Sequence, residues 1–145
     1  TFSNISGSYT DLIVVFNGGV ASSGGNLQMQ VNGDTGSNYS TTTLYGNGSS
    51  ASSGRYSNLS VAYIAGIAAS LPTSLSAMSV FHLMNYSNTT TYKTFLSHYS
   101  NAVAETTNNV ALWRSTSAIT SIKLFSYQEA YLSGSTFSLY GIKAA

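Results

Sequence analysis

The chain has 145 residues, of which 43% are hydrophobic and only 6% are charged, with a formal net charge of +1; this composition suits one domain, residues 1–145, with a single core. Its five Lys and Arg residues are scattered, which excludes nucleic-acid binding through clustered basic side chains, and the lack of Cys excludes disulfides and thiolate metal sites. No apolar run reaches the roughly 18 residues that a membrane span requires, so we predict no membrane insertion.

Short β-branched and aromatic runs alternate with Gly, Ser, Asn and Thr clusters along the whole chain, which predicts an all-β fold. The first run, residues 9–16, is apolar on both faces from Leu12 to Phe16. It is therefore expected at the centre of a sheet or beneath a neighbouring subunit. Residues 27–31 alternate strictly, so the Leu, Met and Val are predicted to face inward and both Gln side chains outward.

The middle of the chain is less regular. Residues 39–45 predict a strand, and the tract GNGSSASSGRYSN, residues 46–58, has the composition of a flexible exposed loop. Residues 61–71 fit either a buried strand or a short helix; we favour a strand for the first half, ended by Gly66 and then Pro72.

The second half predicts further strands and no helix. Residues 76–86 and 91–99 flank a turn and resemble a hairpin, and strand candidates follow at 109–114, 118–127 and 136–142. Strands without intervening helices pair antiparallel, because parallel pairing needs long crossovers. We therefore predict an antiparallel two-sheet β-sandwich of about eight to nine strands, jelly-roll-like in topology.

The closing residues 134–143 read GSTFSLYGIK and predict the strand that completes a sheet. Period-two alternation places Phe137 and Leu139 inward and Ser138 outward. Gly134 is expected in the turn that enters the strand, and Gly141 where the strand bends or no side chain fits.

Acidic residues and histidines give no sign of an active site. Of the four carboxylates, Asp11 opens a strand and the others fall in apparent loops, where solvated surface acids are usual; these are Asp34, Glu105 and Glu129. His82 and His98 lie near opposite ends of the predicted hairpin, and His82 shares a face with apolar residues, which favours a buried, hydrogen-bonded histidine over a metal ligand. We assign no catalytic, cofactor-binding or metal-binding residue and predict a protein that is not an enzyme.

Tyrosine is the most suggestive residue type, with eleven in the chain. Tyr39, Tyr45, Tyr56 and Tyr86 fall near loops, where a sugar ring could stack on them, and Tyr with Asn, Ser and Gly is typical of adaptable binding surfaces. The alternative interpretation, which we favour, is that most tyrosines line the core or a subunit interface with the hydroxyl hydrogen-bonded.

The ending GSTFSLYGIK, preceded by SAITSI at 117–122, resembles C-terminal modules of bacteriophage tail-fibre and other virion structural proteins. The stretches YTDLIVV at 9–15, VNGDTGSNY at 31–39 and NYSNT at 85–89 fit the same pattern in the same order. The resemblance implies a jelly-roll-like module on a virion surface, often trimeric. Because a tail fibre carries such a module at the end of a longer chain, a chain this short raises the expectation of a head-decoration protein or a fragment.

Taken together, these features lead us to expect a non-enzymatic virion structural protein, either a head-decoration subunit or a tail-fibre tip. The expected partners are further copies of the chain, as a homotrimer, other virion proteins and a host-surface glycan. Few charges and a first strand with two apolar faces independently favour assembly. The alternatives are a stand-alone, lectin-like carbohydrate-binding sandwich and, third, a hydrolase with acids that converge in the fold.

Overall fold

A computed structural model describes residues 1–22, 25–65, 70–101 and 105–144, and every regular element in these ranges is a β-strand. The ten strands are β1 (Asp11–Gly18), β2 (Leu27–Val31), β3 (Tyr39–Gly46), β4 (Ala51–Leu59), β5 (Ala62–Ala65), β6 (Ala77–Leu83), β7 (Lys93–Asn101), β8 (Glu105–Trp113), β9 (Ile122–Ser126) and β10 (Thr136–Ile142). The described part of the chain contains no helix that could cross a membrane.

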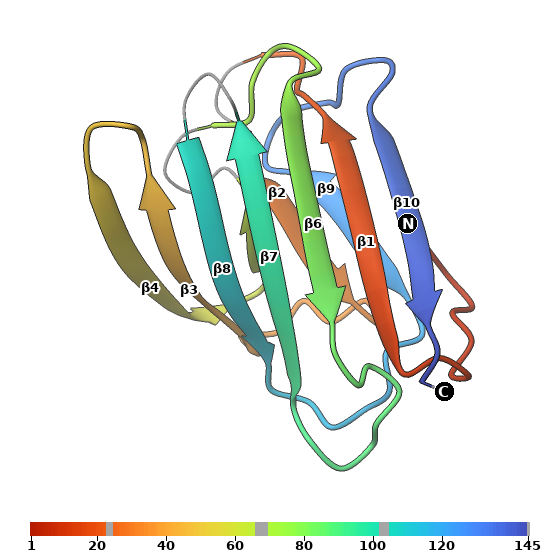
Figure 1. Ribbon diagram of the computed structural model, residues 1–145. Coiled ribbons are helices and arrows are strands. Elements are labelled where there is room, and N and C mark those ends of the chain that lie inside the picture. The colour runs from red at the N-terminus through yellow and green to blue at the C-terminus, as the bar shows by residue number, and fades with distance from the viewer. Residues whose placement is uncertain (23–24, 66–69, 102–104, 145) are drawn as a thin grey trace.

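The strands form two antiparallel sheets that pack as a β-sandwich, as predicted (Figure 1). The large sheet has seven strands in the order β10-β1-β6-β7-β8-β3-β4, and the small sheet has three in the order β5-β2-β9. In Figure 1 the small sheet lies behind the large one, and both chain ends lie on the β10 side. Ten strands replace the eight or nine expected, and the jelly-roll topology stays a prediction.

The core lies between the two sheets and follows from the period-two alternation of the strands. In β6 the buried positions are Ala77, Ser79, Phe81 and Leu83, while the residues between them face the other way. The predicted hairpin with β7 is present, with Phe81 opposite Ser97. The inner strands of the large sheet therefore turn one row of side chains to the small sheet and one row away from it.

The first strand lies inside the large sheet, between β10 and β6, as its two apolar faces predicted. Leu12, Val14 and Phe16 are fully buried against the small sheet. Ile13 and Val15, on the opposite side, are half-buried.

The tract predicted as a flexible loop is largely strand β4, which is a correction. β4 pairs only with β3 and forms the edge of the large sheet. Its residues are mostly exposed on both sides, so no alternation marks them in the sequence. The strand exists because the backbone groups of β3 pair with it, and its Ser-rich surface keeps the sheet edge polar.

The small sheet corrects a second expectation. Leu27, Met29 and Val31 are buried as predicted, but Gln28 and Gln30, predicted outward, are also buried. Gln30 Nε2 donates to the carbonyl of Ser60 at 3.0 Å. An alternating pattern fixes which way a side chain points, but loops that cover the second face decide whether it reaches solvent.

The segment 61–71 contains a strand in its first half, β5, as predicted. Gly66, expected to end it, lies outside the described residues. The carbonyl of Pro72 accepts the backbone N–H of Val20 at 2.9 Å, so this proline does lie in a connection that packs against the end of the first strand.

The closing strand β10 pairs along its whole length with β1. Phe137 and Leu139 pack against the core, with the Phe137 ring 4.9 Å from that of Phe16. A Cβ on Gly141 would lie 2.4 Å from the Tyr9 ring, and Gly134 has a φ of +94° in the preceding turn. Both glycines therefore meet the requirements that the sequence predicted for them.

Candidate functional site

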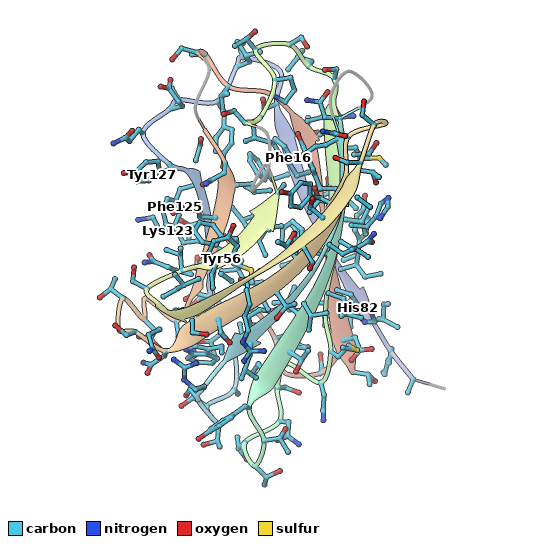
Figure 2. All side chains as sticks on the ribbon, turned by 90° about the vertical axis from the view of Figure 1, so that its left-hand side faces the viewer. Phe16, Tyr56, His82, Lys123, Phe125 and Tyr127 are labelled. Carbon is cyan, nitrogen blue, oxygen red and sulfur yellow. The ribbon has the colours of Figure 1, made fainter. Side chains whose placement is uncertain are left out.

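The side of the large sheet that faces away from the small one is uncovered in the described structure, and we call it the outer face. Figure 2 shows His82 pointing away from the small sheet on this side, whereas Phe16 lies between the sheets. The strand registers place one continuous set of side chains there, which includes Tyr140, Ile13, Val15, Met78, Val80, His82, Leu96, His98, Asn108, Val110 and Leu44.

The outer face carries several exposed apolar side chains and is almost free of charge. Leu96 is 41% exposed, Val110 50% and Leu44 56%. Among the described side chains in this set, the charged ones are Asp11, the first residue of β1, and Arg55, opposite Thr42 at the β4 edge. Exposed apolar side chains gathered on one surface mark an interaction site more often than scattered ones do.

A hollow of about 330 Å³ lies in the middle of the outer face. Val80, Leu96 and Val110 supply its apolar lining, and two histidines contribute polar atoms. Among the described residues, no carboxylate lines the hollow. Its chemistry therefore fits an apolar group of a partner better than a charged substrate.

His82 and His98 are closer together than the sequence indicated. His98 lies opposite Val80, and His82 lies opposite Leu96, so the two histidines are diagonal neighbours on β6 and β7. Neither is buried in the core, which corrects the expectation for His82. The expected hydrogen bond is present: His82 Nε2 lies 3.0 Å from Asp11 Oδ2.

The four carboxylates stand on separate elements. Asp11 begins β1 and Glu129 lies between β9 and β10, where it accepts a hydrogen bond from Ser22. Glu105 was expected in a solvated loop but begins β8 and is buried, because the β7–β8 hairpin extends further than the apolar pattern indicates. Within the described residues, no three His, Cys, Asp or Glu side chains gather as a metal site would require.

Asp34 holds the loop between β2 and β3 in place. Its carboxylate accepts the Trp113 indole N–H at 2.6 Å, an Asn38 amide N–H at 2.9 Å and the Gly36 backbone N–H at 2.8 Å. Burial raises the pKa of Asp34, but these three hydrogen bonds together outweigh it and lower the pKa below its usual value. This arrangement supports the interpretation of NGDTGSN as a structural turn, and Asn32 and Gly33 both have the positive φ of a type I′ turn.

The four tyrosines singled out as ligand contacts divide into two groups. Tyr39 and Tyr86 are fully buried: the Tyr39 hydroxyl lies 3.1 Å from the backbone N–H of Val31, and the Tyr86 hydroxyl donates to the carbonyl of Ser6. Burial raises the pKa of Tyr39 to about 12. Both therefore have the core environment of the interpretation that we favoured from the sequence.

Tyr45 and Tyr56 lie nearer to solvent. Tyr45 is half-buried near the end of β3, and Tyr56 is 38% exposed on β4. The Tyr56 ring meets the ring of Tyr63 edge-on, with centroids 5.6 Å apart. Of the four, Tyr56 is the one with a large exposed ring, and its neighbour Tyr63 was not identified from the sequence.

Sequence reasoning also missed a set of polar contacts inside the sandwich. The carbonyl of Ile64, on the edge strand β5, accepts hydrogen bonds from Ser97 Oγ at 2.9 Å and Asn109 Nδ2 at 2.8 Å. Thr41 Oγ1 accepts the backbone N–H of Tyr63 at 3.2 Å. Side chains of the large sheet thus satisfy the free edge of the small one. These contacts could have been suspected from the sequence, because polar residues stand at inward positions of the predicted strands.

Comparison of the chain with models of known protein families, with curated proteins and with solved structures gave no match.

Proposed function

We propose that this chain is a non-enzymatic structural protein that assembles through the outer face of its large sheet, as a surface module of a bacteriophage virion. The observation that carries the assembly role is the outer face itself, a surface with exposed apolar side chains, few charges and a hollow at its centre. The virion role rests on the sequence resemblance, whose closing stretch corresponds to β10. Head decoration and tail-fibre tip both fit this role, with host-surface glycan as a further contact.

The proposed occupant of the outer face is another copy of the same chain. Leu44 protrudes next to the hollow, because it pairs with Asn108 on the neighbouring strand. The hollow of one copy can therefore receive an apolar side chain of the next, and the resemblance implies a closed ring of three copies. The near absence of charge means that two such faces meet without like-charge repulsion.

The size of the outer face is sufficient for a stable contact. Seven strands spaced about 4.8 Å apart, with about 24 Å of length each, cover about 800 Å² per copy. Specific interfaces bury about 1,200–2,000 Å² in total, or about 800 Å² per partner. A contact that covers the whole face reaches this range, and a ring of three, in which each copy divides its face between two neighbours, buries about 2,400 Å² in all.

The deciding experiment is a mass measurement by light scattering at about 10 to 100 μM protein. We expect the wild-type chain to have the mass of three chains of 15.2 kDa each. Leu96→Glu places a charge in the hollow and should return the mass to that of one chain, because an unpaired charge is costly to bury in an interface. Leu96 is exposed in the single chain, so folding is expected to survive, which circular dichroism would check.

The matched control is Thr89→Glu, which adds the same charge to an exposed position in the turn between β6 and β7 and should leave the mass of the assembly unchanged. A wild-type protein that stays monomeric at 100 μM would refute the proposal. A monomer that also binds oligosaccharides would instead support the lectin-like alternative, for which the exposed ring of Tyr56 is the specific observation.

A further inference from the structure

Three buried side-chain oxygens on the inner face of β3 and β8 have no hydrogen-bond partner among the described residues. They are Thr43 Oγ1, Thr107 Oγ1 and Asn109 Oδ1, and none of these residues is more than 3% exposed. An isolated unpaired polar atom in a core is costly, and native proteins contain few of them. Three in one place indicate that something else satisfies them.

The strand register brings the three residues together. Thr43 on β3 lies directly opposite Asn109 on β8. Thr107 is two residues along β8, so its side chain points to the same side. Tyr99 on β7 lies opposite Thr107 and flanks the group on its other side. These side chains form one polar patch between the sheets.

The orientation of Asn109 fixes what the patch can bind. Its amide nitrogen donates to the Ile64 carbonyl at 2.8 Å and to Ser97 Oγ at 2.9 Å, which uses both N–H groups. The remaining oxygen can only accept. The two threonine hydroxyls can each donate and accept. The complementary ligand is small and uncharged, donates to an amide oxygen, and exchanges hydrogen bonds with two hydroxyls.

We propose that an ordered water molecule binds between Thr43, Thr107 and Asn109 and is an integral part of the sandwich core. Buried waters in proteins make about three such hydrogen bonds to groups that would otherwise be unsatisfied. The water donates to Asn109 Oδ1 and links the hydroxyls on β3 and β8. A metal cation is the competing occupant, because Glu105 is the next inward residue of β8, and the experiment separates the two.

The experiment is a double-mutant cycle with Thr43→Val and Thr107→Val, read out as the melting temperature. Valine keeps the shape of threonine and removes the hydroxyl. If both hydroxyls bind one water, each single variant should melt about 3 °C lower, the shift expected for one lost buried hydrogen bond. The double variant should lose less than the sum, because both changes act on the same water. Thr89→Val, in the exposed turn between β6 and β7 and away from the outer face, is the matched control and should melt like the wild type.

The opposite result would overturn the proposal. If the oxygens have no partner at all, each valine removes an unsatisfied group and both variants melt higher, with additive shifts. If the occupant is a metal, a chelator lowers the melting temperature of the wild type but not of the double variant. A crystal structure of the wild-type protein, with a solvent peak within hydrogen-bond distance of the three oxygens, would confirm the site directly.

Discussion

Asp34 is a single residue whose charge holds a loop to the sandwich. Its folded pKa is lowered by the hydrogen bonds from Trp113, Asn38 and Gly36, against the raising effect of burial. The stability it contributes is therefore fully present above the unfolded pKa of about 3.9 and is lost as the pH falls through the lower folded pKa. Asp34→Asn should reduce the free energy of unfolding by roughly 1 kcal/mol at pH 7 and by less at pH 2, in melts followed by Trp113 fluorescence.

Glu129→Gln serves as the control, because Glu129 lies in an exposed loop and bonds a serine rather than the indole. Equal destabilisation by Asp34→Asn at pH 7 and pH 2 would show that the carboxylate charge contributes nothing.

Phe137 and Ser138 test the register of the closing strand at two adjacent positions. The Phe137 ring lies 4.9 Å from Phe16 and 5.0 Å from Tyr131, centroid to centroid. We expect Phe137→Ala to cost about 3 kcal/mol, measured by urea unfolding. Ser138→Ala should change the stability by less than about 0.5 kcal/mol, because Ser138 lies opposite Val15 on the outer face. Similar effects at both positions would contradict the register.

At the scale of elements, β10 is the edge strand of the large sheet and pairs with β1. Residues 134–145 supply the hydrogen-bond partners of β1 on one side and two aromatic or aliphatic side chains to the core. Deleting these residues leaves the β1 backbone as an unpaired edge beside an opened core. We predict that the shortened chain loses the dispersed proton NMR spectrum and the cooperative melt of the full chain. A shortened chain that melts like the wild type would show that β10 is dispensable.

At the scale of the whole molecule, the unequal sheets explain both candidate features. Three strands cover one side of a seven-stranded sheet, and the described structure leaves the other side bare. The outer face is therefore available for another copy. On the inner side, the edge of the small sheet meets polar side chains of the large one, which creates the polar patch where we infer a water.

Much of the fold follows from local sequence patterns. Period-two alternation predicted the strands and the inward side of β2 and β10, because the pleat fixes the direction of each side chain. The two glycines of the closing stretch were predicted separately, Gly134 in the turn before the strand and Gly141 where no side chain fits, and the structure confirms both. Alternation did not predict β4, whose residues bury little on either side and so carry no pattern.

The candidate sites depended on tertiary structure, because the sequence of one strand does not show which distant strand it pairs with. The sequence showed that Met78, Val80 and His82 share a face, but only the covering of the opposite face by the small sheet made theirs the outer one. Likewise, Thr43 and Asn109 are 66 positions apart and become neighbours only through the β3–β8 register. Composition and alternation alone determined that this chain would form an antiparallel sandwich poor in charge. Which surface stays bare, and which polar atoms are enclosed, was decided by how the two sheets divide the strands, since burial is a property of packing and not of the local chain.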